Sequence, residues 1–155
     1  MESPQVIALA HKDKQTFLSL RTAGSLSLLP ENLTWLWQKG ESPLMAQEIR
    51  DADGCTLNQI MSSTLSAGLQ DHLAAYLKQK NEHLVTLAER RDLATISVIG
   101  EGFSQSPETV ARVLRAMPTE PVFLETKNTA INIGLPETAL ESSIKSLHAA
   151  LLEAH

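Results

Sequence analysis

The stretch that decides the fold is Ile96-Ser-Val-Ile-Gly-Glu-Gly-Phe103. Its apolar start is typical of a short buried strand, and the two glycines that follow predict a bend. Ser106 and Pro107 then predict a helix start, because serine is a favoured N-cap and proline fits the first helical turn. The helix has one buried stripe, because apolar residues recur at helical spacing in Val110, Val113, Leu114 and Met117.

Two strands and a helix complete the C-terminal region. The apolar segments 122–124 and 130–133 are expected to be strands joined near Lys127 and Asn128. Pro136 begins the closing helix. The expected core face of that helix is Leu140, Ile144, Leu147 and Leu151.

The N-terminal region predicts a similar order of elements. Segments 6–10 and 16–20 are expected to be two strands, separated by the polar residues 11–14. A helix begins at Pro30 and ends near Gly40. Its expected apolar face is Leu33, Leu36 and Trp37. The remaining expected elements are a strand at 44–49, a turn at 51–54, a strand at 56–61, a helix at 67–80 and a strand at 83–88.

Both halves therefore have the order β-α-β-β-α, with a strand available to finish each. The predicted fold class is α+β, with two ferredoxin-like units of order βαββαβ. Each unit is expected to be an antiparallel four-stranded sheet with both helices on one face. No residue identity is visible between the halves, so the predicted repeat is one of pattern alone.

Composition limits the possible functions. The chain has 155 residues, with 43% hydrophobic and 20% charged, as in soluble globular proteins. The net charge of −5 and the lack of a basic stripe argue against nucleic acid and anionic membranes as partners. No apolar run is long enough to span a bilayer. The single cysteine, Cys55, fits a reducing cytoplasm and is expected to be a buried, inert thiol.

No pattern of catalytic, metal-binding or cofactor-binding residues is found. Gly100-Glu-Gly102 is an isolated Gly-X-Gly, without the third glycine or the lysine of a nucleotide-binding loop. The histidines do not have metal-ligand spacing, and no nucleophile elbow is present. Glu48, Asp51 and Asp53 cluster near the first turn, where they form either a solvated turn or an edge that binds an ammonium group.

Two short motifs carry a resemblance to a known family. Val98-Ile-Gly-Glu-Gly102 and Leu147-His-Ala-Ala-Leu151 resemble the C-terminal regulatory region of the aspartokinases, which consists of tandem ACT domains. The resemblance covers residues 94–152 and extends more loosely back to Val6. It implies two interleaved ACT units: residues 14–90 form the first, and residues 91–155 form the second, completed by strand 5–11.

The resemblance also implies that this chain is not an enzyme by itself. The Lys-Phe-Gly-Gly-Thr signature of the aspartokinase catalytic domain is absent. A regulatory region of this kind is expected to bind a small amino acid, lysine or threonine, to form a homodimer through its ACT units, and to act on a kinase catalytic domain.

The expected effector contacts lie in two loops. A zwitterion needs donors for its carboxylate, and a helix N-terminus offers backbone N–H groups and a favourable dipole. In the first unit the contacts are Gly24, Ser25, Ser27, Met45, Gln47 and Glu48. In the second unit they are Gly102, Phe103, Ser104, Asn128 and Thr129. Pro30 and Glu31 depart from the family pattern, because proline removes a donor and Glu31 puts negative charge beside the expected carboxylate position.

Three functions stay open at this point. The first is allosteric feedback control of aspartate-family amino-acid biosynthesis, in which the effector prefers one arrangement of the units. The second is an ACT-type dimerisation module with degenerate effector sites, paired through sheet edges or through leftover apolar residues such as Trp35. The third, a small enzyme, has the least support because no acid, base or metal constellation appears.

Overall fold

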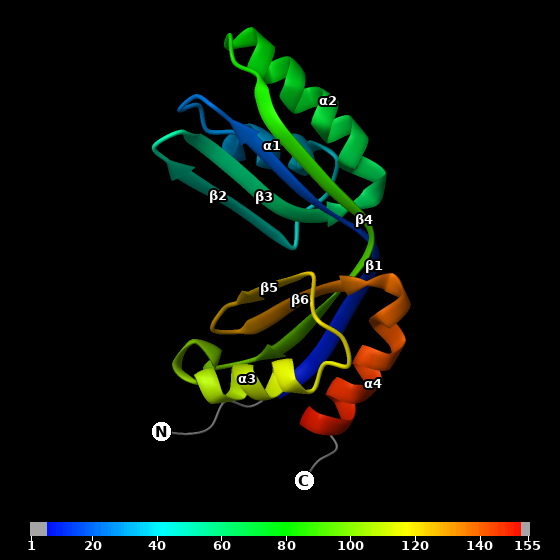
Figure 1. Ribbon diagram of the computed structural model, residues 1–155. Coiled ribbons are helices and arrows are strands. Elements are labelled where there is room, and N and C mark those ends of the chain that lie inside the picture. The colour runs from blue at the N-terminus through cyan, green and yellow to red at the C-terminus, as the bar shows by residue number, and fades with distance from the viewer. Residues whose placement is uncertain (1–5, 153–155) are drawn as a thin grey trace. The chain divides into compact units, whose positions relative to one another are not determined.

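The computed structural model of the chain describes residues 6–152, so Gln5 of the expected strand 5–11 and residues 153–155 lie outside it. The chain divides into two compact units (Figure 1). We call residues 14–92 the inserted unit. We call residues 6–13 and 93–152 the split unit, because the inserted unit interrupts it in the sequence.

The inserted unit is a four-stranded sheet with two helices. Its strand order is β2-β3-β1-β4, and β3 pairs antiparallel with both β1 and β2. Leu36 of the first helix and Leu73 of the second share one core with Leu18, Leu20 and Leu57 of the sheet, so both helices cover the same face. The elements are β1 (Val6–Thr22), α1 (Leu29–Gln38), β2 (Met45–Asp51), β3 (Gly54–Ser62), α2 (Ser63–Gln79) and β4 (Leu84–Gly100).

The split unit repeats this plan with a borrowed strand. Its strand order is β1-β4-β6-β5, so the N-terminal part of β1 takes the edge position of a fourth strand. Val113 and Leu147, from its two helices, share one core with Ile96, Ile131 and Ile133 of the sheet. The further elements are η1 (Phe103–Gln105), α3 (Pro107–Arg115), β5 (Phe123–Thr126), β6 (Ala130–Pro136), η2 (Glu137–Ala139) and α4 (Leu140–Leu151).

The predicted fold class is confirmed. In the inserted unit the central strands are β1 and β3, and β2 and β4 lie at the edges. In the split unit the central strands are β4 and β6, and β5 and the N-terminal part of β1 lie at the edges. Both sheets therefore have the ferredoxin-like strand order. The units are interleaved, because β1 and β4 each contribute residues to both.

The expected break at residues 11–14 is wrong. β1 is one strand of 17 residues. The strand expected at 83–88 and the strand expected at the start of the Ile96–Phe103 stretch are likewise one strand, β4. Lys14 in β1 and Asp92 in β4 have φ angles of 52° and 59°, in the left-handed region. Both residues lie where the chain passes from one unit to the other. A single left-handed residue redirects a strand without ending it, as in a β-bulge.

The expected apolar face of α1 is wrong in two of its three residues. Leu36 is fully buried, but Trp37 is 81% exposed and Leu33 is 40% exposed. The inward face instead contains Asn32, a buried polar residue that interrupts the apolar pattern in the sequence. Trp35 is partly buried and packs against the core, so it is not an unused apolar residue. Helical spacing places Asn32 and Leu36 on one face, and Leu33 and Trp37 one step around the helix.

Candidate effector-binding loops

The loop between β1 and α1 is joined to β2 by one carboxylate. Leu28 and Leu29 donate their backbone N–H groups to Glu48 Oε2 at 2.8 and 3.0 Å, and Ser27 Oγ donates to Glu48 Oε1 at 2.5 Å. These backbone groups are among the N–H donors that a helix start leaves without partners inside the helix. No N-cap side chain satisfies them, since residue 28 is a leucine. Glu48 therefore caps α1 from a neighbouring strand.

The electrostatics of Glu48 follow from these contacts. Burial by itself would raise the pKa of its carboxyl group, but the hydrogen bonds from Ser27 and from the Leu28 and Leu29 amides outweigh that effect and lower it. Cys55, on β3, lies next to Glu48 of β2. Burial and the negative charge of Glu48 raise the pKa of the Cys55 thiol. The side chain of Cys55 is 3% exposed, so the expectation of a buried thiol is confirmed.

The other expected loop contacts are also engaged within the protein. The Ser25 carbonyl accepts a hydrogen bond of 2.8 Å from Arg50 Nη2. Gly24 lies against the carboxylate of Glu82, which a Cβ atom at position 24 would strike. Ser25 and Ser27 are therefore each bonded to a charged side chain, and Gly24 lies close to one.

The pleat of β2 separates the expected strand contacts. Glu48 is opposite the core residue Leu57, so it lies on the sheet face that carries the helices. Successive strand residues point to opposite faces. Met45 and Gln47, at odd spacing from Glu48, therefore lie on the other face. The structure brings Ser27 and Glu48 together but does not bring Met45 or Gln47 to them.

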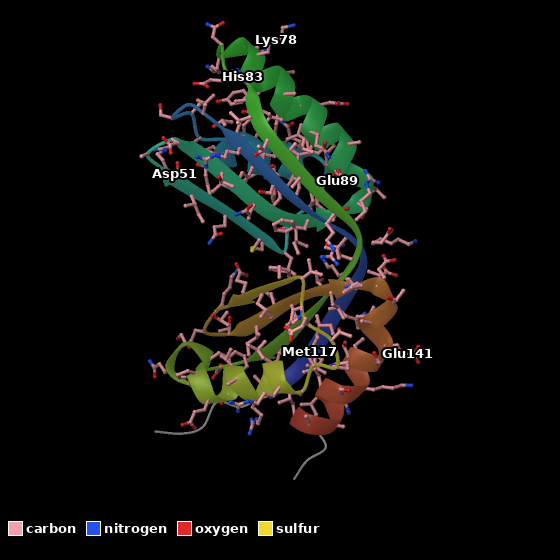
Figure 2. The ribbon with its side chains drawn as sticks, in the orientation of Figure 1. Asp51, Lys78, His83, Glu89, Met117 and Glu141 are labelled. Atoms are coloured by element: carbon pink, nitrogen blue, oxygen red, sulfur yellow. The ribbon has the colours of Figure 1, made fainter. Side chains whose placement is uncertain are left out.

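The acidic cluster near the first turn has two structural roles. Asp51, labelled in Figure 2, accepts hydrogen bonds from both terminal nitrogens of Arg21 at 2.9 and 3.0 Å, and from the Asp53 backbone N–H at 2.8 Å. The Arg21 bonds come first among the causes that lower the pKa of Asp51 to about 2. Asp51 therefore stabilises the β2–β3 turn, and Glu48 caps the N-terminus of α1.

In the split unit, the structure brings all five expected loop residues together. The Phe103 N–H donates to the Asn128 carbonyl and the Gly100 N–H to the Thr129 carbonyl, both at 3.1 Å. Ser104 Oγ donates to Asn128 Oδ1 at 2.8 Å. Gly102 has a φ of 81°, which glycine adopts without strain, and this turn directs Phe103 into the core, where it is 1% exposed.

The expected N-cap of α3 is wrong in its chemistry. The helix begins at Pro107 as expected, but Ser106 makes no side-chain hydrogen bond to the helix backbone. Its hydroxyl pairs with the Thr109 hydroxyl at 2.9 Å instead.

The sequence pattern missed a polar pair that recurs in both units. Ser19 Oγ donates to Asn58 Oδ1 at 2.6 Å, and Ser97 Oγ donates to Asn132 Oδ1 at 2.7 Å. Each pair joins directly opposite residues on the first and third strands of its unit. The repeat is therefore visible in residues, but only once the strand register is known. The cap by Glu48 was missed for the same reason, because nearly twenty residues separate it from the helix start.

Within residues 6–152, no cluster of three or more His, Cys, Asp or Glu side chains has the arrangement of a metal site. Across the same range, no helix combines the length and apolar character that a membrane span requires.

Solved structures similar to this chain include aspartate kinases and their regulatory parts. The chain is similar to the ligand-free regulatory subunit of aspartate kinase from Thermus thermophilus, with 16% identity, a TM-score of 0.73, and coverage of 94% of this chain and 97% of that one. It is similar to E. coli aspartokinase III in complex with lysine and aspartate in the T-state, with 20% identity, a TM-score of 0.68, and coverage of 98% and 34%. For aspartate kinase from Synechocystis the identity is 17%, the TM-score 0.76, and the coverage 97% and 27%.

A scan against protein-family models found no match, and a search of curated protein sequences also found none. At these identities the structural likeness concerns the fold. The resemblance seen in the sequence is confirmed at that level: the chain has, over nearly its whole length, the fold of the regulatory part of aspartate kinases.

Proposed function

We propose that this chain is a regulatory module of an aspartate-kinase-type enzyme and does not itself transfer phosphate. One observation carries the proposal. The chain matches 97% of the Thermus regulatory subunit but about a third of E. coli aspartokinase III. The protein that it matches over nearly the whole length is a regulatory subunit.

The proposed partner is a kinase catalytic domain, and the proposed effector is a small amino acid. Lysine is the first candidate, because the E. coli structure holds lysine and aspartate, and threonine is the second. The effector acts by preferring one of two arrangements of a dimer of this chain, so its differential affinity shifts the population and with it the activity of the kinase. This is feedback control of aspartate-family amino-acid biosynthesis, in the cytoplasm.

The proposed effector contacts are in one of the two loops predicted from the sequence. In the split unit they are Gly102, Phe103, Ser104, Asn128 and Thr129. Phe103 shapes that loop from the core, while Ser104 is exposed and accessible to a ligand. In the inserted unit the predicted contacts Ser27 and Glu48 bond to each other, so the split unit is the proposed site of effector binding.

A second candidate is a dimerisation module that binds no effector. It is favoured by the internal engagement of both loops: Glu48 fills the start of α1, and Asn128 bonds to Phe103 and Ser104. Groups that are already paired gain less from a ligand, because a new bond must replace an existing one.

Calorimetric titration separates the two candidates. Lysine, threonine and the other proteinogenic amino acids are titrated into the purified chain, and its mass in solution is measured alongside. Saturable binding of lysine or threonine that is weakened by Ser104→Ala supports the regulatory module. The matched control is Ser142→Ala, which removes a serine of the same unit whose hydroxyl donates to the Ala139 carbonyl. A stable dimer that binds no amino acid contradicts the effector role and supports the second candidate.

A further inference from the structure

We propose that the Glu48 carboxylate is a tethered ligand that occupies the anion site of the inserted unit and makes this unit unresponsive to free amino acids. The inference deepens the proposed function and rests on it for the statement that the competing free ligand is an amino-acid carboxylate. It starts from three donors that converge on one carboxylate.

The donor set is that of a carboxylate-binding site. Two consecutive backbone N–H groups at the start of α1 and one hydroxyl, from Ser27, surround the two oxygens of Glu48. A helix N-terminus attracts anions because its N–H groups are unpaired and its dipole is positive there. A free carboxylate at this position would need the same three donors, and Glu48 already uses them.

The register of β2 against β3 places the Glu48 side chain at the start of α1. Glu48 lies opposite Leu57 on the helix-bearing face of the sheet, so its side chain rises toward the start of α1. A tethered carboxylate has a high effective concentration, since no translational freedom is lost when it binds. A free amino acid at millimolar concentration competes poorly with it.

Two further side chains lie at the same loop. Arg50, two residues along β2 from Glu48, donates to the Ser25 carbonyl, and the Glu82 carboxylate lies against Gly24. Glu48 and Arg50 of β2 thus both bond to this loop.

One buried polar group on this face stays without a partner. Thr22 Oγ1 is buried, and it makes no hydrogen bond within the described part of the chain. Thr22 is directly opposite Cys55, the residue beside Glu48, and it follows Leu18 and Leu20 at even spacing, which puts it on the helix-bearing face. A buried hydroxyl without a partner is costly, and Thr22 places one directly across from Cys55, whose thiol lies beside the Glu48 carboxylate.

It follows that the two units differ in their response to free amino acids. The inserted unit keeps the arrangement of a carboxylate-bound state at all effector concentrations. Any response to a free amino acid then belongs to the split unit, whose loop carries no carboxylate among its internal contacts.

Chemical rescue tests the tethered ligand. Thermal unfolding of Glu48→Ala is followed in increasing sodium acetate, against sodium chloride at the same ionic strength. Loss of a helix cap lowers the melting temperature of a small domain by about 4–8 °C. We expect acetate to restore this loss saturably in Glu48→Ala and to leave the wild type unchanged. Glu48→Gln fills the site without the charge, so acetate should not restore it.

The matched control is Glu125→Ala, which removes a carboxylate of the split unit that accepts a hydrogen bond from Asn132 and pairs with Lys127 at 3.6 Å. If acetate stabilises Glu125→Ala or the wild type as much as Glu48→Ala, the effect is a general ion effect and the proposal is wrong. It is also wrong if folded Glu48→Ala, verified by circular dichroism, shows no response to acetate.

A measurement on the wild type covers the case in which Glu48→Ala does not fold. Hydrogen exchange of the Leu28 and Leu29 amides should be slow, and 10 mM lysine should not change it. Fast exchange, or protection that appears only with lysine, overturns the proposal. The rescue by acetate needs neither a kinase nor an effector, so a failure of the regulatory function leaves its outcome interpretable.

Discussion

The side-chain amides of Asn32 and Gln59 bond to each other twice. Asn32 Nδ2 donates to Gln59 Oε1 and Gln59 Nε2 donates to Asn32 Oδ1, both at 2.8 Å, and both residues are fully buried. The pair joins α1 to the central strand β3. It thereby sets the position of the helix whose N-terminus Glu48 caps.

Breaking this pair on one side should be costly. Asn32→Leu leaves the Gln59 amide buried without a partner, and we expect a loss of about 1–3 kcal/mol in the free energy of unfolding. The double variant Asn32→Leu/Gln59→Leu removes both amides and should recover much of that loss. Chemical denaturation of the two single variants and the double variant measures the coupling. Equal and additive losses would show that the pair has no special role.

We predict that the main role of Phe103 is to stabilise the folded split unit. Its ring is buried in the core of the split unit, so Phe103→Ala should cost about 3–5 kcal/mol and unfold that unit at moderate temperature. Phe103→Leu should be much milder, because it keeps most of the volume. Circular dichroism during thermal unfolding distinguishes the two. A Phe103→Ala variant with wild-type stability would show that the ring is dispensable for the core.

Asp51 should contribute stability that depends on pH. Its pKa in the folded chain is about 2, below the ordinary value of 3.8, because Arg21 and the Asp53 amide favour the ionised form. The contribution is therefore complete above pH 3.8 and is lost as the pH falls through 2. The melting temperatures of wild type and Asp51→Asn should differ by a constant amount from pH 7 to 4 and converge toward pH 2. The pair is exposed, so the difference should be small and should shrink in high salt.

Asp92 tests the left-handed position in β4. Its φ of 59° is tolerated by aspartate and by glycine, but a β-branched residue is strained there. Asp92→Gly should keep the wild-type stability within about 1 kcal/mol, because the relief of strain offsets the greater freedom of the unfolded chain. Asp92→Val should lose about 1–2 kcal/mol. Equal effects of the two substitutions in urea denaturation would mean that the left-handed conformation is not maintained in solution.

The sequence predicted the order of elements because turns and helix starts are local signals. Pro30, Gly40 and Pro107 mark helix ends as expected, since their backbone preferences do not depend on distant residues. The continuity of β1 through Lys14 could not be predicted. A polar, charged segment looks like a loop, and only the pairing of strands far apart in sequence keeps it extended.

The sequence predicted which segments form the candidate site, but not which contacts their residues make. Ser27 and Glu48 were both expected there, because a loop before a helix and a following strand commonly meet in this fold. That Glu48 would serve the helix start depends on the register of β2 against β3, which places residue 48 on one face and residue 47 on the other. A shift of one residue would exchange them, and no local pattern fixes that choice.

Titration of lysine and threonine into the wild-type chain and into Ser27→Ala and Ser104→Ala variants tests most directly which unit binds the effector. We predict one saturable site per chain, with affinity that is weakened by Ser104→Ala and unchanged by Ser27→Ala, because the tethered Glu48 excludes the effector from the inserted unit. Binding that is lost in Ser27→Ala and intact in Ser104→Ala would contradict the account.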